Sequence, residues 1–307
     1  MKIGVISNAA YAVPLLQLCA NNRIQASVFA DACSDKDSTS ALRHFCQVMS
    51  VPLYEWEPAM LYTWIKELNP DIVFILGYSH LIDIQQLPSL LLDAVYNIHF
   101  GPLPTYRGPN PVFWQIRNNA STLGVTIHRI NEKFDDGPVV WAKDILRGYH
   151  INYGTAHTIL AHVALEGVAH ILQHHAQQKK LSPLPQSTVA SRYYRRPALN
   201  DVLINWAEME LGEILNIILA CNPWNKGGLT LYQGSEVKII DAEVSKDKSV
   251  NSASFIPGTI ANHNKCLQVV CKGNKLLNIN MLALDGAFIP ARHAEKYGFL
   301  KGRQLGN

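Results

Sequence analysis

The stretch Ile72-Val73-Phe74-Ile75-Leu76-Gly77 (IVFILG) is apolar up to its closing glycine. A strand covered on both faces, as in a parallel sheet between two layers of helices, has this continuously apolar pattern. The stretch follows Asn69-Pro70-Asp71, a stop signal for the amphipathic helix expected over 58–68. It therefore predicts an interior strand of an α/β sheet.

Short apolar runs alternate with amphipathic segments on both sides of this strand. Further strands are expected at 2–7, 24–30, 95–99 and 124–130, and helices at 12–21, 38–50 and 155–173. The alternation predicts an α/β fold with a doubly wound, mostly parallel sheet. Ligands bind such sheets at the carboxyl ends of the strands, so the residues that follow each strand are candidates for a site.

The sequence changes character after residue 176. Residues 177–200 are rich in Gln, Lys, Ser, Pro and Arg without a clear period, which is typical of a linker. A helix is expected beyond it at 207–220, followed by short alternating runs between 228 and 282 that favour a small β-barrel-like domain. We therefore expect a catalytic domain over 1–180, a linker over 181–203 and a smaller C-terminal barrel-like domain over 204–307.

Composition narrows the class of protein. Hydrophobic residues make up 48% of the chain and charged residues 17%, which favours a globular protein over a disordered one. The formal net charge of +3 allows an anionic partner without requiring nucleic acid, and we expect no DNA partner. No stretch approaches the ~20 apolar residues of a membrane span, and polar residues interrupt the apolar N-terminal run, so neither a membrane partner nor a signal segment is expected.

The cysteines and histidines also bear on compartment and metal binding. The six cysteines form no C-x-x-C pair and no regular framework, a pattern that favours buried, reduced thiols and a cytoplasmic protein. His174 and His175 are adjacent and so do not share one face of a helix. We therefore expect no metal site.

The segment 96–108 (YNIHFGPLPTYRG) places polar side chains where the strand at 95–99 ends. Residues two apart on a strand point to the same face, so Asn97 and His99 are expected to project together. An amide can donate to a developing oxyanion, and an imidazole can carry a proton near neutral pH. An Asn-x-His pair alone is more often structural than catalytic, so the motif needs support from elsewhere in the chain.

That support comes from 124–138 (GVTIHRINEKFDDGP), where a strand runs into a turn with two carboxylates. Asp135 is expected to reach His99, fix its tautomer and stabilise the imidazolium. Asp136 is expected to lie in the turn and not on His99. Taken alone, Asp135-Asp136-Gly137 would be interpreted as an ordinary turn.

Taken together, the two segments resemble the hallmark regions of the folate-dependent formyltransferase family, which includes methionyl-tRNA, glycinamide ribonucleotide and sugar N-formyltransferases. The family pattern has four parts, Asn-x-His, Leu-Pro-x-x-Arg-Gly, Gly-Val-Thr and Asp-x-Gly. They occur here in order at 97–99, 103–108, 124–126 and 135–137. The resemblance covers nearly the whole chain and is strongest over 70–140.

The resemblance implies a reaction and a set of site residues. The formyl donor would be 10-formyltetrahydrofolate and the acceptor a primary amine. Asn97 and protonated His99 would stabilise the oxyanion, and Asp135 would assist removal of a proton. The residues expected to contact the donor are Leu76, Gly77, Tyr78, Gly101, Leu103, Arg107, Phe134 and Gly137.

Departures from the family pattern concern the acceptor. The tRNA enzyme opens with a Gly-Thr-Pro turn and has a basic insertion after its second strand, whereas this chain has Ser7-Asn8-Ala9-Ala10 and no such insertion over 31–37. Gly101 stands where that enzyme tends to have Ser, and Leu219 where Arg is expected. We therefore expect a small or carrier-bound amine as partner and disfavour tRNA.

Two alternative functions have less support from the sequence. A nicotinamide dehydrogenase would need a G-x-G-x-x-G turn after the first strand, which Ser7–Tyr11 lacks. A non-catalytic RNA-binding module is suggested by the barrel-like domain and by the basic, aromatic run at 192–196. One such run is more often a solvated linker, so this reading has little support.

Overall fold

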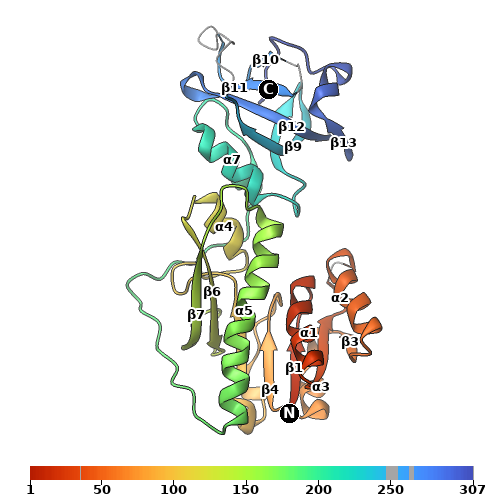
Figure 1. The fold of residues 1–307 in the computed structure, drawn as a ribbon, viewed down its shortest axis with the longest axis vertical. Helices are drawn as coiled ribbons and strands as arrows, with labels where there is room; N and C mark the ends of the chain where they lie inside the picture. Colours follow the sequence, from red (N-terminus) through yellow and green to blue (C-terminus); the bar gives the residue numbers. More distant parts are fainter. Residues whose placement is uncertain (35, 247–254, 263–265, 307) are drawn as a thin grey trace. The chain divides into compact units, whose positions relative to one another are not determined.

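The computed structural model describes residues 1–34, 36–246, 255–262 and 266–306. The chain forms two compact units (Figure 1). The N-terminal unit comprises Met1–Pro111, Thr122–Leu146 and His157–Arg195, and the C-terminal unit comprises Val112–Ser121, Arg147–Ala156 and Arg196–Asn307.

The N-terminal unit is built on a seven-stranded sheet with the order β3-β2-β1-β4-β5-β6-β7. Its strands are β1 (Lys2–Ile6), β2 (Gln25–Asp31), β3 (Leu53–Trp56), β4 (Ile72–Ile75), β5 (Val95–His99), β6 (Thr122–Arg129) and β7 (Val139–Leu146). The pairings among β1 to β5 are parallel, and those of β5 with β6 and β6 with β7 are antiparallel. The α/β fold with a doubly wound, mostly parallel sheet is confirmed.

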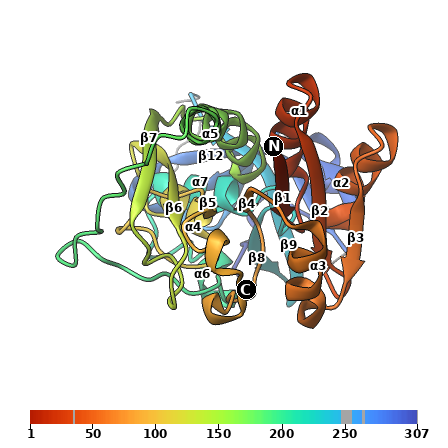
Figure 2. The ribbon, with the colours of Figure 1, turned by 90° about the horizontal axis from the view of Figure 1, so that it is seen from below.

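Helices cover both faces of this sheet, and Figure 2 shows α1 and α5 on one face and α3 on the other. The helices of this unit are α1 (Val13–Asn21), α2 (Lys36–Val48), α3 (Leu61–Leu68) and, from His157 on, α5 (Tyr153–Ala176). α4 (Pro111–Arg117) belongs to the C-terminal unit from Val112 on. α5 lies close to β6 and β7 because Gly167 has no side chain; a Cβ there would come within 2.5 Å of the Trp141 ring. α3 ends at Leu68, and the next residue, Asn69, adopts the left-handed conformation typical of a helix C-terminus.

The central strands are buried as their apolar sequences require. All four residues of β4 are buried, and Ile3, Val5 and Ile6 of β1 have no exposed surface. In β1 and β4 the buried residues are apolar, and the polar Ser7 and the exposed Gly77 come only after the strands end. The end of β5 and the residues that follow β4 therefore lie at the carboxyl edge of the parallel strands, whereas β6 is antiparallel and its following turn begins beside the start of β5.

Two strands of this sheet were not predicted from the sequence. β3 is short and only partly buried, so its four residues give no clear pattern. β7 follows the turn at Asp135–Pro138, where the chain reverses and pairs antiparallel with β6. As the edge strand it exposes Ala142, Lys143 and Asp144, which hides the alternation of a half-buried strand.

The C-terminal unit contains a six-stranded antiparallel sheet that curls as a half-barrel, so the β-barrel-like prediction is confirmed. Its strands are β8 (Gly228–Tyr232), β9 (Ser235–Val244), β10 (Ile260–Asn262), β11 (Leu267–Val270), β12 (Leu276–Leu284) and β13 (Ala287–Pro290). A short helix α6 (Leu199–Val202) and a longer one, α7 (Leu211–Ala220), precede the sheet.

The helix expected at 207–220 begins four residues later than predicted. The side-chain oxygen of Asn205 accepts hydrogen bonds from the N–H groups of Ala207 and Glu208, which holds this segment as a turn. The helix starts after Glu210, whose backbone N–H donates to the Glu213 carboxylate. Side-chain capping of this kind competes with the helix itself and is hard to locate from periodicity.

Candidate active site

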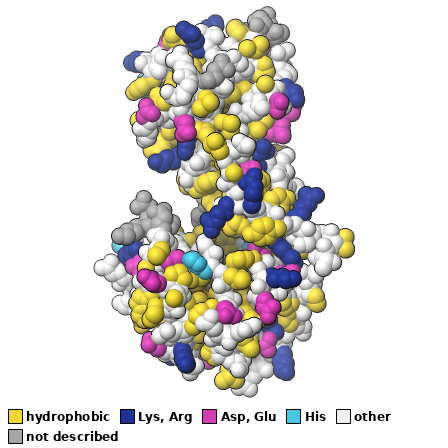
Figure 3. All heavy atoms as spheres, turned by 180° about the vertical axis from the view of Figure 1, so that it is seen from behind, with side chains coloured by type: hydrophobic (Ala, Val, Ile, Leu, Met, Phe, Trp, Pro, Cys, Tyr) yellow, Lys and Arg dark blue, Asp and Glu magenta, His cyan; other side chains and the backbone are white. Residues whose placement is uncertain are grey.

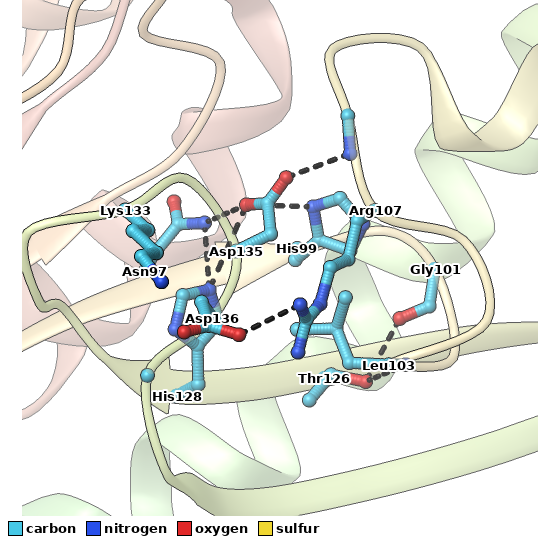
Figure 4. A network of polar contacts seen from close by, with 12 residues as sticks. Asn97, His99, Gly101, Leu103, Arg107, Thr126, His128, Lys133, Asp135 and Asp136 are labelled. Carbon is cyan, nitrogen blue, oxygen red and sulfur yellow. Dashed lines mark hydrogen bonds and ion pairs between the residues drawn. The ribbon is translucent and has the colours of Figure 1, made fainter. Parts of the chain in front are cut away.

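The register between β5 and β6 creates a polar face at the carboxyl end of β5. Asn97 lies opposite His128, and His99 lies opposite Thr126. Because alternate residues of a strand share a face, these four side chains project from the same side of the sheet. Figure 4 shows them together with Asp135 from the following turn.

Asp135 is held at the centre of this group by two donors. The backbone N–H of Gly108 donates to Oδ2 at 2.8 Å, and Nδ2 of Asn97 donates to Oδ1 at 3.3 Å. Oδ1 also lies 3.4 Å from Nδ1 of His99. Asp135 is therefore in contact with both of the other residues predicted as catalytic, and the side chains of His99 and Asp135 are no more than 10% exposed.

The imidazole of His99 lies between two acceptors. Its Nε2 donates to the carbonyl oxygen of Tyr106 at 2.7 Å, and its Nδ1 faces Asp135. A neutral ring has one N–H and satisfies one acceptor, whereas the imidazolium satisfies both. Burial lowers the pKa of His99, while the Asp135 carboxylate and the Tyr106 carbonyl act in the opposite direction.

The carboxyl group of Asp135 remains ionised despite its burial. Burial by itself raises the pKa of Asp135, but the neighbouring imidazoles and the backbone N–H of Gly108 together lower it to about 2. The donors from Asn97 and Gly108 do not titrate in this range, so they hold the negative charge whether or not His99 is protonated. The site thus contains a fixed buried carboxylate beside an imidazole of variable charge.

His128 is a member of this network that the sequence analysis did not single out. Its Nδ1 lies 2.8 Å from the carbonyl oxygen of Arg129, which can only accept, so this nitrogen carries the proton. In the neutral ring Nε2 is then an acceptor, 3.1 Å from Nδ2 of Asn97. Both hydrogens of the Asn97 amide are engaged, one by His128 and one by Asp135. The signal was the spacing of Thr126 and His128, two apart on one strand.

Thr126 organises the loop that follows β5. Its hydroxyl donates to the carbonyl oxygen of Gly101 at 2.8 Å and accepts from the N–H of Leu103 at 3.2 Å. Gly101 is packed closely, because a Cβ at this position would lie 2.8 Å from Cβ of Pro111 and 3.0 Å from Nε2 of His99. Gly101 therefore lets the loop pass directly beside the catalytic imidazole.

Three residues after β4 are predicted to contact the formyl donor, and they differ in which of their atoms are exposed. The side chain of Leu76 is in the core with 2% exposure, so this residue offers only backbone atoms. Gly77 is exposed and has a positive φ of 64°. Tyr78 directs its ring towards Phe29 and His80, and burial raises the pKa of its hydroxyl to about 12.

In the two loops, the residues predicted to contact the formyl donor also differ in their exposure and contacts. Phe134 is 47% exposed beside the buried Asp135. Gly137 is buried, and a Cβ there would lie 1.7 Å from the carbonyl oxygen of Arg129, so its role in the structure is close packing. The guanidinium of Arg107 is occupied by Asp136 at 2.6 Å and by the side chain of Gln186. Asp136 thus pairs with Arg107 and not with His99.

Four of the six cysteines are buried as expected, whereas Cys33 is exposed and Cys266 is partly exposed. Burial raises the pKa of Cys19 and Cys46 to about 11 and that of Cys221 and Cys271 to about 12. Thiols of this kind are poor nucleophiles near neutral pH. Within the described residues, no group of His, Cys, Asp and Glu is arranged to hold a metal ion, and no helix has the length and apolar character of a membrane span.

An ionised buried carboxylate, an imidazole and a side-chain amide suit acyl transfer. A carboxylate can take up a proton, and imidazole and amide N–H groups can stabilise an oxyanion. None of these three roles requires a covalent intermediate with the protein.

Comparisons with known proteins agree with this chemistry. Methionyl-tRNA formyltransferase of Pelotomaculum thermopropionicum is 26% identical over 277 residues, which cover 88% of this chain and 83% of that protein. HypX from Aquifex aeolicus, in complex with tetrahydrofolic acid, is similar in structure with a TM-score of 0.73 and 16% identity; the match covers 99% of this chain and 48% of that one. The N-formyltransferase from Helicobacter canadensis, in complex with folinic acid and dTDP-3-aminofucose, has a TM-score of 0.68 and 18% identity over 91% of this chain and 98% of that one. These two structural similarities concern the fold.

Two family matches cover most of the sequence. Residues 2–151 match the family described as formyl transferase, and residues 199–292 match the formyl transferase C-terminal domain. The first match contains the whole polar network around Asp135 except Gln186, and the second covers most of the antiparallel sheet. The chain therefore belongs to the formyl transferase family of enzymes.

Proposed function

We propose that this enzyme transfers the formyl group of 10-formyltetrahydrofolate to the primary amine of a small or carrier-bound substrate. The observation that supports the reaction is the contact of Asn97, His99 and Asp135 at the carboxyl end of β5. Membership of an enzyme family removes the alternative of a non-catalytic RNA-binding module.

The residues around the site fit a folate donor. Gly77 and Phe134 are exposed, and Leu103 is partly exposed, so backbone and apolar side-chain surface are available to a flat aromatic ring. Leu76, Gly101 and Gly137 would contribute through backbone atoms and close packing. Arg107 would act indirectly, because it holds its loop in place through Asp136 and Gln186. Tyr78 would contact the donor through its backbone. HypX with tetrahydrofolic acid and the Helicobacter N-formyltransferase with folinic acid support this choice of donor.

The donor would supply the formyl group, and the three residues would handle the charges of the transfer. Asp135 accepts a proton from the attacking amine, directly or through a water, and the proton returns to the leaving nitrogen of tetrahydrofolate when the bond between that nitrogen and the formyl carbon breaks. The protonated form of His99 stabilises negative charge on the formyl oxygen. As Asp135 becomes protonated its Oδ1 is a weaker acceptor, which releases an N–H of Asn97 towards the same oxyanion.

The acceptor is proposed from the charge around the second strand. β2 ends at Asp31 and α2 begins at Lys36, so the connection has no room for a basic insertion; residue 35 lies outside the described residues. On the face of the N-terminal unit that Figure 3 shows, the described Lys and Arg side chains lie among Asp and Glu side chains. Because phosphate neutralisation supplies most non-specific affinity for nucleic acid, a small amine fits this surface better than tRNA.

A second candidate is formylation of methionyl-tRNA. It is favoured by the 26% identity with the Pelotomaculum enzyme over 88% of this chain. The dTDP-3-aminofucose in the Helicobacter complex favours instead a nucleotide-linked amino sugar. The two candidates share the donor and the site and differ only in the acceptor.

An acceptor panel separates the two. Purified enzyme with 10-formyltetrahydrofolate is given nucleotide-linked amino sugars, carrier-bound amines or initiator methionyl-tRNA, and release of tetrahydrofolate is measured. We expect release with an amine of the first two classes and little with the tRNA. Efficient formylation of methionyl-tRNA would overturn the proposed acceptor but not the reaction. If none of the acceptors gave release of tetrahydrofolate, the proposed reaction itself would be overturned. His99→Ala enzyme serves as the blank.

A further inference from the structure

Residues 184–194, here called the strap, lie within the expected linker but are bound to the loops of the active site. Leu184 and Val139 exchange two backbone hydrogen bonds of 2.8 Å. Arg192 donates to the carbonyl of Pro104 at 3.1 Å and accepts from the N–H of Arg107 at 3.0 Å. The strap is therefore part of the N-terminal unit, which extends to residue 195.

The end of the strap is fixed by Tyr194. Its N–H donates to the carbonyl of Arg107 at 2.8 Å, and its ring stacks on Tyr106 with centroids 5.1 Å apart and planes 12° apart. Gly108 leaves room for this contact, because a Cβ there would lie 2.0 Å from the carbonyl oxygen of Tyr194. Tyr106 is also the residue whose carbonyl accepts from His99.

Gln186 is the side chain through which the strap reaches the catalytic turn. Its Nε2 donates to the carbonyl oxygens of Asp135 at 2.9 Å and Gly137 at 2.8 Å. Its Oε1 accepts from Nε of Arg107 at 3.1 Å and from Nη2 at 2.6 Å. Both amide hydrogens and the amide oxygen are thus used, and all four bonds go to the two loops of the site.

These bonds bear on the position of the Asp135 carboxylate. Asp135 has a φ of 53°, a left-handed conformation that costs energy for a residue with a side chain and persists only when its surroundings hold it. Gln186 holds the carbonyl of Asp135 itself and, two residues later, that of Gly137. Through Arg107 it also fixes the loop whose next residue, Gly108, donates to the carboxylate.

We infer that Gln186 is a positioning residue for Asp135, which sets the distance between its carboxylate and His99. The inference rests on the proposed role of Asp135 in formyl transfer. Gln186 lies between the two family matches, at 2–151 and 199–292, so neither match covers it.

Gln186→Glu separates the N–H donors of the Gln186 side chain from its oxygen acceptor. A glutamate keeps oxygen acceptors for Arg107 but has no N–H for the carbonyls of Asp135 and Gly137. We expect Gln186→Glu and Gln186→Ala each to lower kcat about tenfold or more, with KM for the donor changed less than about threefold, since a small misplacement of a catalytic group costs rate more than binding. Val189→Ala, which alters a strap side chain that is 96% exposed, is the matched control and should keep wild-type kcat.

A double-mutant cycle tests whether Gln186 acts through Asp135. In the Asp135→Asn background, Gln186→Glu should change kcat less than about twofold, because the group that it positions is already removed. Wild-type kcat in Gln186→Glu, or a full additive loss in the double variant, would overturn the inference.

Titration of His99 by NMR gives a readout that needs no turnover. The Asp135 carboxylate raises the pKa of His99, so its displacement in Gln186→Ala, which introduces no new charge, should lower that pKa relative to the wild type. The same pKa in both proteins would overturn the positioning role even if the formyl-transfer proposal stands. A wild type that transfers no formyl group would instead overturn the proposed function, and the titration would still decide the role of Gln186.

Discussion

At the scale of the residue, Asp135 controls two things at once. It is the candidate proton acceptor, and its charge is what opposes the loss of the proton from buried His99. Removing the Asp135 carboxylate therefore removes a base and also favours the neutral imidazole. For this reason its effect on turnover should be at least as large as that of Asn97, which contributes donors alone.

Substitution of the three residues should abolish most activity. Asn97→Ala, His99→Ala and Asp135→Ala should each lower kcat by about 10²-fold or more, the range for a lost oxyanion or acid-base group. Asp136→Ala should be milder, because this carboxylate contacts Arg107 and not His99. Steady-state kinetics with circular dichroism as a folding check measures this, and near wild-type turnover in His99→Ala would contradict it.

The ionisation of Asp135 should make the fold sensitive to acid. Its pKa is lowered from 3.8 to about 2, so its charge stabilises the folded chain above about pH 4, and this contribution is lost as the pH falls towards 2. The shift corresponds to roughly 2 kcal/mol. In urea denaturation, the stability difference between wild type and Asp135→Asn should shrink as the pH falls from about 5 to about 2. A difference independent of pH over this range would contradict the prediction.

The sequence identified the catalytic candidates because each sits in a short, ordered pattern with a chemical reason. Asn97 and His99 follow from strand periodicity, and Asp135 from the turn after the next strand. The spacing of Thr126 and His128 indicated a shared face but not what it contacts, and Gln186 had no local signal. Their roles depend on the pairing register of two strands and on the return of a distant segment, neither of which is a local property of the chain.

At the scale of the element, the turn between β6 and β7 depends on a close backbone contact. Gly137→Ala would place a methyl group against the carbonyl of Arg129, which must move. We expect a loss of about 1–3 kcal/mol in stability, the usual range for overpacking, together with reduced kcat because Asp135 is in the same turn.

Gly212→Ala is the matched control for this change. Gly212 is in α7 with no heavy atom within 4 Å of a Cβ, so alanine there should be neutral or stabilising by roughly 0.5–1 kcal/mol. Chemical denaturation followed by circular dichroism compares the two. Equal stability of both variants would show that the contact at Gly137 relaxes freely.

The elements of the two units were predictable to different degrees. β4 and β5 were visible because a buried strand is apolar throughout, and α5 because its apolar residues recur at helical spacing. β3, β7 and β13 were missed, since short or exposed edge strands have little apolar signal. The linker over 181–203 stays a prediction as a domain boundary. Part of it is bound to the site loops by backbone hydrogen bonds, which cannot be predicted from amino-acid composition.

At the scale of the whole molecule, the small net charge of +3 has a kinetic consequence. With a small amine acceptor, kcat/KM should change less than about twofold between roughly 50 and 200 mM KCl, because few phosphates are neutralised on binding. A steep loss over this range, of about 10-fold or more, would indicate a nucleic-acid acceptor. Repeating the series with KCl replaced by potassium glutamate controls for effects of chloride.

The strap also sets where this protein can be cut and rejoined. In an exchange of C-terminal domains between formyl transferases, a junction at the end of the long helix α5 would come before the strap. A graft made there would import a foreign strap, and with it a foreign side chain in the place of Gln186. Arg195 is the last residue of the N-terminal unit, although Val112–Ser121 and Arg147–Ala156 of the C-terminal unit precede it in the chain. Chimaeras joined after Arg195 keep the catalytic turn with its own support, whichever domain follows.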